Sequence, residues 1–173
     1  MFPLRKKSDV YATFLTFHAY ARTQFDLPIV AIQSDNGREF DNTKLDSFCA
    51  SQGITFWFSC PYTSQQNGKA ERSIHTTSNV IRTLLIQAPL PPLFWAEALH
   101  TATFLINIRP TSSTNFLPPY TLLIGTTPPY NSLRVFGCLC FPNQYATMAN
   151  KLNPRSSRCI FLGYALEHKG YRC

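Results

Sequence analysis

The chain has 173 residues, of which 45% are hydrophobic, and this excludes a disordered tail and allows one domain or one domain with a small second one. Its formal net charge of +7 and pI of about 9.3 favour an anionic partner. The excess of positive charge lies almost wholly in residues 101–173, which carry seven Lys or Arg and one Glu. We therefore expect nucleic acid as the binding partner. We expect neither a membrane span nor a secretory signal, because the sequence has no apolar run of the required kind.

The six cysteines form no pattern typical of a zinc site, because none lie in a C-x-x-C pair and no histidine stands at a ligand spacing. Cys138 and Cys140 alternate with apolar residues, which places them on the same face of a predicted strand. We therefore expect both to be small buried hydrophobic residues in a reducing compartment, the nucleus or cytoplasm. The six are Cys49, Cys60, Cys138, Cys140, Cys159 and Cys173.

Residues 9–25 predict a helix with Ser8 as its N-cap, and Pro28 stands beyond its end. The β-branched run 29–34 is typical of a fully buried strand. Apolar residues recur at helical spacing along one face of the predicted helix: Val10, Phe14, Phe17, Ala21 and Phe25.

Residues 42–53 predict a short helix closed by Gly53, and residues 54–60 predict a second strand. The order helix, strand, helix, strand indicates an α/β layer with parallel strands. A polar loop follows, and residues 69–87 then predict a long helix. Its apolar stripe is Ala70, Ile74, Thr77, Ile81, Leu84 and Leu85.

Residues 91–108 predict another helix with proline at its start, and residues 110–132 are rich in Pro, Ser and Thr and indicate a linker. Strand-like runs at 133–142 and 158–173 suit a small β-barrel-like module.

Two carboxylates lie where a metal site of an α/β fold could form. Asp35 directly follows the first strand, where the turn Asn36–Gly37 would expose it at the carboxyl end of the sheet. Glu71 lies in the first turn of the long helix, and thirty-five residues separate the two acids. Oxygen ligands on two separate elements suit Mg²⁺ or Mn²⁺, and two such ions promote displacement at a phosphodiester.

By themselves these two residues favour an ordinary structural role, because Asp-Asn-Gly is a common turn and the helix dipole favours Glu near a helix start. Glu39 and Asp41 are expected to be solvated or capping groups, and Asp9 is expected to support the start of the first helix. A structural role is not the better interpretation for the polar side of the long helix. There His75 and Arg82 flank Glu71, and we expect them to contact phosphates.

Five stretches together resemble the integrase region of copia-type long-terminal-repeat retrotransposon Pol polyproteins, in the same order and with similar spacings. The resemblance implies a truncated RNase H-like integrase core over residues 1–109, a linker over 110–132 and an incomplete retroviral-type SH3-like module over 133–173. The stretches are SDNGREF, GITFWFSCPYTSQQNGKAER, LFWAEALHTATFLINIRP, LRVFGCLCFP and RCIFLGYALEHKGYRC.

The resemblance also implies a function. The family has an Asp, Asp, Glu triad with thirty-five residues between the last two, which matches Asp35 and Glu71 as catalytic residues and ligands of Mg²⁺ or Mn²⁺. The implied reaction is processing of the element's DNA ends and strand transfer into target DNA, with DNA and further copies of the chain as partners. The expected DNA contacts are Gln66, Asn67, Lys69, Arg72, His75 and Arg82.

One departure limits this expectation. In the family the first Asp lies on a strand upstream of a segment resembling FPLRKKSD, at which this sequence begins. Asp9 matches the start of a helix in the family and cannot replace that residue. We therefore expect an incomplete triad, no catalysis by this chain alone, and an unpaired apolar edge on the strand 29–34 that favours aggregation.

Two alternatives remain open. The chain could be a non-catalytic DNA-binding remnant or domesticated protein, and whether it is an enzyme is then undecided. It could also be an RNase H-like nuclease acting on RNA–DNA hybrids, although the long helix and the trailing β module suit integration better.

Overall fold

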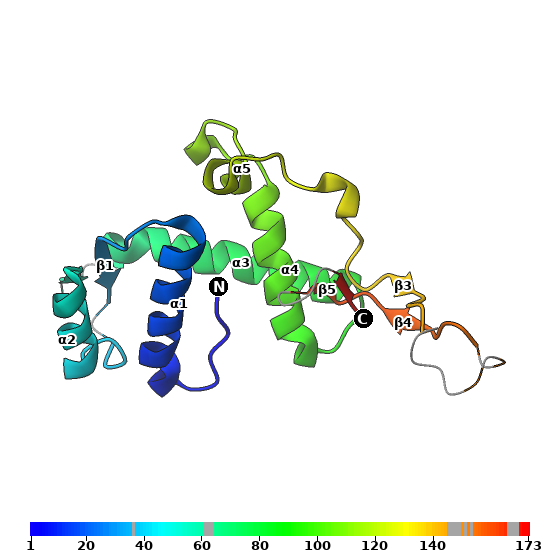
Figure 1. Cartoon of the computed structure of the whole chain (residues 1–173), viewed down its shortest axis with the longest axis horizontal. Helices are drawn as coiled ribbons and strands as arrows, with labels where there is room; N and C mark the ends of the chain where they lie inside the picture. Colours follow the sequence, from blue (N-terminus) through cyan, green and yellow to red (C-terminus); the bar gives the residue numbers. More distant parts are fainter. Residues whose placement is uncertain (36, 61–63, 145–149, 151, 153, 166–169) are drawn as a thin grey trace. The chain divides into compact units, whose positions relative to one another are not determined.

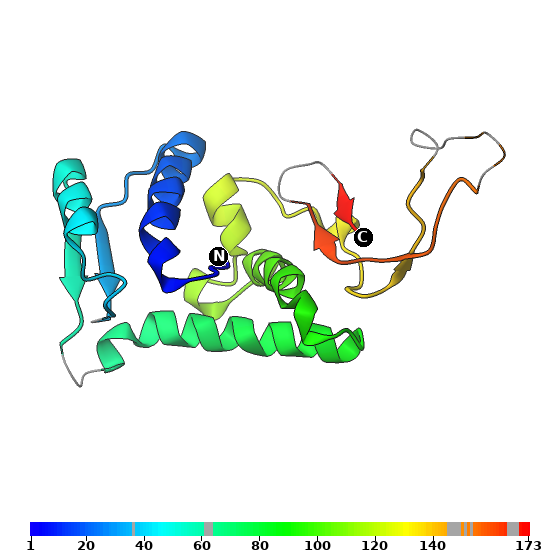
Figure 2. The ribbon, with the colours of Figure 1, turned by 90° about the horizontal axis from the view of Figure 1, so that it is seen from below.

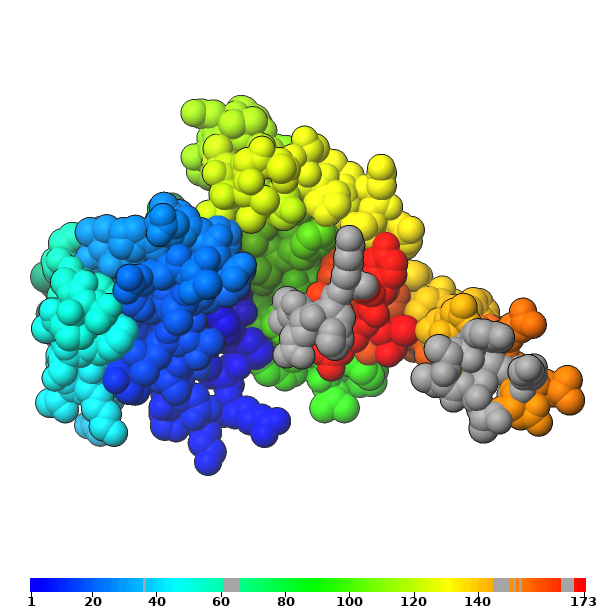
Figure 3. Space-filling model, viewed as in Figure 1, coloured from blue at the N-terminus to red at the C-terminus, as the bar shows by residue number. Residues whose placement is uncertain are grey.

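The computed structural model describes residues 1–35, 37–60, 64–144, 150, 152, 154–165 and 170–173, and the other residues are grey in Figure 3. Asn36 of the predicted turn and parts of the loop between the last two strand runs lie outside the described residues. The chain divides into two compact units, Phe2–Ile74 and His75–Cys173 with Met1, and each is described by itself. Among the described residues no helix is both long and apolar enough to cross a membrane.

The first unit is an α/β layer, as the sequence predicts. Its strands pair in parallel with Ile32 opposite Phe56, and the helices α1 and α2 pack against the face that carries these two side chains (Figures 1 and 2). Its elements are η1 (Lys7–Asp9), α1 (Val10–Phe25), β1 (Ala31–Ser34), α2 (Thr43–Gln52), β2 (Thr55–Phe58) and η2 (Ser64–Asn67), and α3 (Gly68–Gln87) starts here. Its fully buried core is Leu45, Cys49 and Ile54.

The start and the buried face of α1 differ from the prediction. Ser8 is no N-cap, because it lies within η1, and the Asp9 carboxylate instead accepts a hydrogen bond from the Lys6 backbone N–H (3.2 Å). Phe17 is 40% exposed, whereas His18 is 8% exposed. The His18 ring packs edge-on against Phe48 of α2 with centroids 5.2 Å apart, so packing against α2 decides which face is buried.

The helix α2 agrees with the prediction at both ends. The Asn42 side-chain oxygen accepts from the Leu45 backbone N–H (2.9 Å), which satisfies one donor of the first turn. Gly53 ends the helix with a φ of 69°, a left-handed conformation that glycine adopts without strain.

The sequence predicted a fully buried strand at residues 29–34, and this prediction is wrong because β1 is partly exposed. Within the described residues its sheet has the order β1–β2, so one edge of β1 has no strand partner. Val30 is 70% exposed just before β1, and on the face away from the helices Gln33 and Trp57 are exposed. The apolar open edge that the sequence led us to expect is therefore present among the described residues.

The second unit is built around α4 (Trp95–Ile108), in which Ala98 and Ala102 are 0% exposed. The segment predicted as a linker contains a short helix, α5, which lies at the surface, yellow-green in Figure 3. The remaining elements are η3 (Pro92–Phe94), η4 (Ser112–Thr114), α5 (Pro119–Ile124), η5 (Tyr130–Ser132), β3 (Leu139–Cys140), β4 (Cys159–Ile160), β5 (Gly163–Tyr164) and β6 (Tyr171–Arg172).

The predicted strand runs form two short antiparallel pairs, β3–β4 and β5–β6. The second pair packs directly on α4. Gly163 has a φ of 123°, and a Cβ at this position would lie 2.4 Å from the Thr101 hydroxyl oxygen. Arg172 forms an ion pair with Glu97 of α4 at 3.3 Å. Thus α4, from the predicted 1–109 domain, belongs to the same compact unit as residues 133–173.

Candidate functional site

Asp35 follows β1 directly and is exposed. Its Oδ1 accepts from the Gly37 backbone N–H (3.3 Å) and the Ser34 hydroxyl (3.4 Å), and no hydrogen bond among the described residues falls on Oδ2. These bonds orient the carboxylate and keep one oxygen available for a ligand.

Gly37, from the predicted Asn36–Gly37 turn, does not have the positive φ that glycine alone adopts easily. A Cβ at this position would lie 3.1 Å from Oδ1 of Asp35 and 3.0 Å from the carboxyl group of Glu39. The glycine therefore gives room for two carboxylates to approach the backbone.

Glu71 lies in the first turn of α3, as predicted, and it is exposed. The described residues provide no hydrogen bond or ion pair to its carboxylate. A Glu there is favoured by the helix dipole, and its oxygens are open to a cation.

Gln66 connects the segments that carry the two acids, a role that sequence reasoning missed. Its backbone oxygen accepts from the side-chain amide of Gln33 in β1 (3.1 Å), and its side-chain oxygen accepts from the backbone N–H of Cys60 after β2 (2.8 Å). The start of α3 is thereby tied to the same end of the sheet at which Asp35 lies. That Gln66 contacts DNA stays a prediction.

The donor set suits a hard divalent cation. Asp35 and Glu71 offer carboxylate oxygens from two elements, and Mg²⁺ is commonly held by one or two carboxylates, with waters and substrate phosphates completing its shell. Among the described residues no group of three or more potential ligands is close enough to hold a metal ion. Asp35 and Glu71 therefore have the chemistry of ligands for such an ion, and a third is not found in the part of the chain that the structure describes.

Glu39 does not belong to this donor set. Its Oε1 pairs with the Lys7 ammonium at 3.0 Å. Backbone hydrogen bonds, and then the bond to Lys7, lower the pKa of Glu39. Asp41 is exposed, as expected for a solvated group.

The predicted DNA contacts on α3 lie along an exposed polar face. Asn79 connects two of them: its side-chain amide bonds to Nδ1 of His75 (3.3 Å), and its oxygen accepts from Arg82 (3.3 Å). Nearer the helix start, the Arg72 guanidinium donates to the Gly68 backbone oxygen (3.1 Å), and Lys69 is exposed. Asn67 is half-buried.

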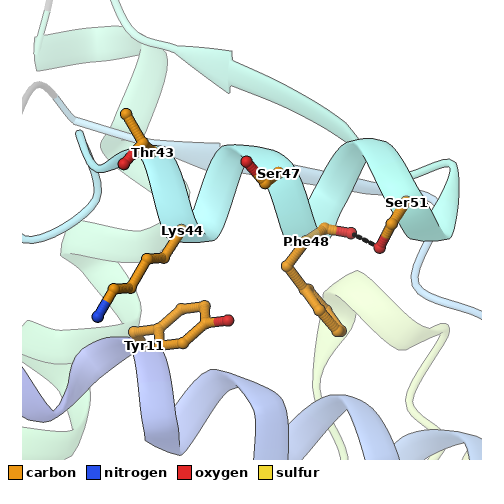
Figure 4. Close-up of a pocket in the computed structure, with 6 residues that line it drawn as sticks. All are labelled: Tyr11, Thr43, Lys44, Ser47, Phe48 and Ser51. Atoms are coloured by element: carbon orange, nitrogen blue, oxygen red, sulfur yellow. Dashed lines mark hydrogen bonds between the residues drawn. The ribbon is translucent and has the colours of Figure 1, made fainter.

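Hollows lie beside α2 in the first unit, and two of them are near the start of this helix. Figure 4 shows the first, roughly 460 Å³ between α1 and α2, where Tyr11 and Lys44 point into it. No carboxylate lines it, so it does not suit a metal ion. The second, roughly 520 Å³, has the charged lining residues Lys7, Arg38, Lys44 and Glu39. Glu39 pairs with Lys7, and the described ion pairs include neither Arg38 nor Lys44, so the hollow carries a net positive charge. Arg38 stands three residues after Asp35 in the sequence.

The chain matches known proteins over its whole length. It is 38% identical over 173 residues to the retrovirus-related Pol polyprotein from transposon RE1 of Arabidopsis thaliana, and covers 12% of that protein. It is 36% identical over 169 residues, 98% of the chain, to the corresponding polyprotein from transposon TNT 1-94 of Nicotiana tabacum, and covers 13% of it. Residues 138–173 match the family model of the retroviral polymerase SH3-like domain.

Solved structures show the same fold. The HTLV-2 integrase catalytic core domain, solved in complex with magnesium, matches 68% of this chain and 70% of its own, with a TM-score of 0.50 and 20% identity. A chain of the simian T-cell lymphotropic virus intasome, solved with PP2A regulatory subunit B56 gamma, matches 94% of this chain and 56% of its own, with a TM-score of 0.56 and 18% identity. The fold of the matched residues is therefore similar to that of integrase catalytic cores, and residues 138–173 match a retroviral SH3-like domain.

Proposed function

From the homology of this chain to one segment of copia-type retrotransposon Pol polyproteins, we propose that it is the part of an integrase that binds DNA and supplies two metal-binding carboxylates. The reaction is metal-dependent processing of DNA 3′ ends and strand transfer, carried out by the longer protein. The observation that carries the proposal is the pair of hydrogen bonds at Gln66, which ties the Asp35 segment to the start of the Glu71 helix.

The chemistry follows from the residue types. Asp35 and Glu71 bind Mg²⁺ or Mn²⁺, which when bound activates the attacking oxygen and stabilises the leaving one. Gly37 and Ser34 hold the Asp35 carboxylate in one orientation through its Oδ1. Arg72, His75 and Arg82 contact phosphates, which positions the DNA backbone without reading its sequence.

The 173-residue chain is proposed to be inactive alone. Phosphoryl transfer by two ions depends on both being positioned, and two carboxylates leave the second ion short of protein ligands. Copies of the chain and DNA are the proposed partners.

The test is strand transfer by a longer Pol segment that contains this chain, using labelled donor ends and Mn²⁺. Asp35→Asn and Glu71→Gln should each reduce transfer to background, whereas Asp41→Asn, a matched exposed acid, should retain it. Full transfer by either of the first two variants would overturn the assignment.

A second candidate, DNA binding without catalysis, is favoured by the exposed polar face of α3 and by the absence of a third ligand among the described residues. It predicts duplex binding that weakens with salt and survives Glu71→Gln. If the longer segment binds DNA in this way and no metal-dependent transfer is found, this candidate replaces the first.

A further inference from the structure

Side-chain hydrogen bonds connect the start of α3 to the carboxyl end of the sheet. The side-chain amide of Gln33 in β1 donates to the backbone oxygen of Gln66 in η2 at 3.1 Å. The side-chain oxygen of Gln66 accepts from the Cys60 backbone N–H at 2.8 Å. Gln66 is therefore bonded both to β1 and to the segment after β2, directly before α3 begins at Gly68.

A second set of bonds joins the two strands at the same end and continues to Asp35. The Ser34 backbone oxygen accepts from the backbone N–H of Ser59 (2.9 Å) and from its hydroxyl (3.1 Å). The Ser34 hydroxyl bonds to the backbone oxygen (2.9 Å) and to Oδ1 (3.4 Å) of Asp35. Both serines are buried, so water does not compete strongly for these bonds.

Together the two sets form a continuous path from one candidate acid to the helix that carries the other. The path leads from Asp35 through the two serines to Cys60, and the Gln66 side chain connects Cys60 to the start of α3. Glu71 lies in the first turn of this helix. Figure 2 shows both strands ending beside the start of α3. The bond from Gln33 is a second and shorter connection, because Gln33 stands two residues before Asp35.

We propose that Gln33 and Gln66 are positioning residues. Their bonds hold the start of α3 against the sheet, and this sets the separation at which Asp35 and Glu71 bind one divalent cation. The inference rests on the proposed function and identifies the residues that keep its two acids together. Neither glutamine is a catalytic residue, because each acts only through the acids.

A purely stabilising role is the competing interpretation, and the surroundings of the two glutamines oppose it. Both side chains are exposed, and exposed hydrogen bonds contribute little to the free energy of folding. The buried core of this unit is formed by other residues, Leu45, Cys49 and Ile54. Loss of the bonds should therefore change the placement of the α3 start more than the stability of the unit.

The experiment titrates Mn²⁺ into the isotopically labelled 173-residue chain and follows the broadening of amide resonances near the bound ion. Gln33→Met removes the donor, and Gln66→Met removes the side-chain acceptor, with little change in side-chain size. Each variant should raise the Mn²⁺ concentration at half-broadening by about fivefold, the effect of losing one ordinary hydrogen bond. Amides beside Asp35 and beside Glu71 should also no longer broaden at the same concentration.

Two further variants separate positioning from stabilisation. Gln66→Glu keeps an oxygen that accepts from the Cys60 N–H and should restore joint broadening of the two segments. Gln24→Met changes an exposed glutamine of α1 and should behave as the wild type. Lower melting temperatures for Gln33→Met and Gln66→Met with joint broadening intact would show a stabilising role and overturn the inference.

Strand transfer by a longer Pol segment separates positioning from DNA contact. Gln66→Met should lower kcat and leave the KM for donor DNA unchanged, because a positioning residue acts on the reacting centre. A raised KM with kcat unchanged would instead assign Gln66 to DNA binding and contradict the inference.

The acids themselves test the proposed function on which the inference rests. If Asp35→Asn or Glu71→Gln leaves joint broadening unchanged, the metal site is wrong and the positioning role falls with it. If both variants remove joint broadening while Gln33→Met and Gln66→Met titrate as the wild type does, the metal site stands and only the positioning role is overturned.

Discussion

The two compact units differ in the element that forms the centre of each. In the Phe2–Ile74 unit three residues form the fully buried core, and the strand β1 has an open edge among the described residues. In the His75–Cys173 unit the face of helix α4 that carries Ala98 and Ala102 is buried, and α4 meets β5 at a glycine. The candidate acids therefore lie beside a small sheet with an open edge, whereas the centre of the other unit is a helix packed against β5.

The largest effect is expected at the contact between β5 and α4. Gly163→Ala places a Cβ 2.4 Å from the Thr101 hydroxyl oxygen and forces an unfavourable φ on alanine. Strain and overpacking together should lower the free energy of unfolding of the second unit by about 4 kcal/mol. Denaturant unfolding measures this. Gly125→Ala, also at positive φ but with open space around it, is the control and should cost about 1 kcal/mol.

A smaller and local effect is expected in the first unit. Leu45→Ala removes a side chain from the core formed with Cys49 and Ile54, and should cost about 3 kcal/mol. Amide hydrogen exchange should accelerate in α2 and β2 but remain unchanged in α4. Equal acceleration in α4 would show that the two units unfold together and would remove the contrast between them.

Thr101→Val tests the same packing contact in the second unit by changing the α4 side of it. The Thr101 hydroxyl is buried and has no hydrogen-bond partner among the described residues. Replacing it with a methyl group should leave the second unit unchanged or stabilise it by up to about 1 kcal/mol. A clear loss of stability in thermal unfolding would instead show that the hydroxyl has a partner.

The smallest effect concerns pH. Burial lowers the pKa of His100 in α4, and the nearby Arg172 cation adds to this, while Glu97 opposes it. Because the folded pKa lies below the unfolded value of about 6.5, this contribution to stability is fully present above that pH and is lost as the pH falls from there through the folded pKa. His100→Gln should flatten the decline in stability of the second unit between pH 7 and pH 5, and an unchanged decline would contradict this.

Much of the fold follows from local sequence. Asn42 and Gly53 mark the ends of α2 because caps depend on neighbouring residues, and the parallel strand pair follows from the order of elements. The sequence predicted the wrong buried face for α1, because that face depends on contact with Phe48, thirty residues away from His18 in the sequence. Such a long-range contact leaves no sign in the spacing of apolar residues along the sequence.

At the candidate site, too, local features could be predicted from the sequence and long-range contacts could not. Position and spacing, together with the resemblance to a family, predict Asp35 and Glu71 as the acids of the site, and this stays a prediction. Gln66 was predicted to contact DNA, and its hydrogen bonds to Gln33 and Cys60 were not predicted. The sequence does not indicate which distant groups the amide of a loop residue will contact. The close approach of Gly163 to Thr101 was missed for the same reason.

The central claim is that Asp35 and Glu71 lie at one end of the sheet and bind the same divalent cation. It is tested most directly by titrating Mn²⁺ into the isotopically labelled chain and following paramagnetic broadening of its amide resonances. We predict that amides beside Asp35 and beside Glu71 broaden together at the same Mn²⁺ concentration, and that Asp35→Asn removes the broadening at both. Broadening at one segment alone, or broadening near Glu71 that persists in Asp35→Asn, would contradict the account.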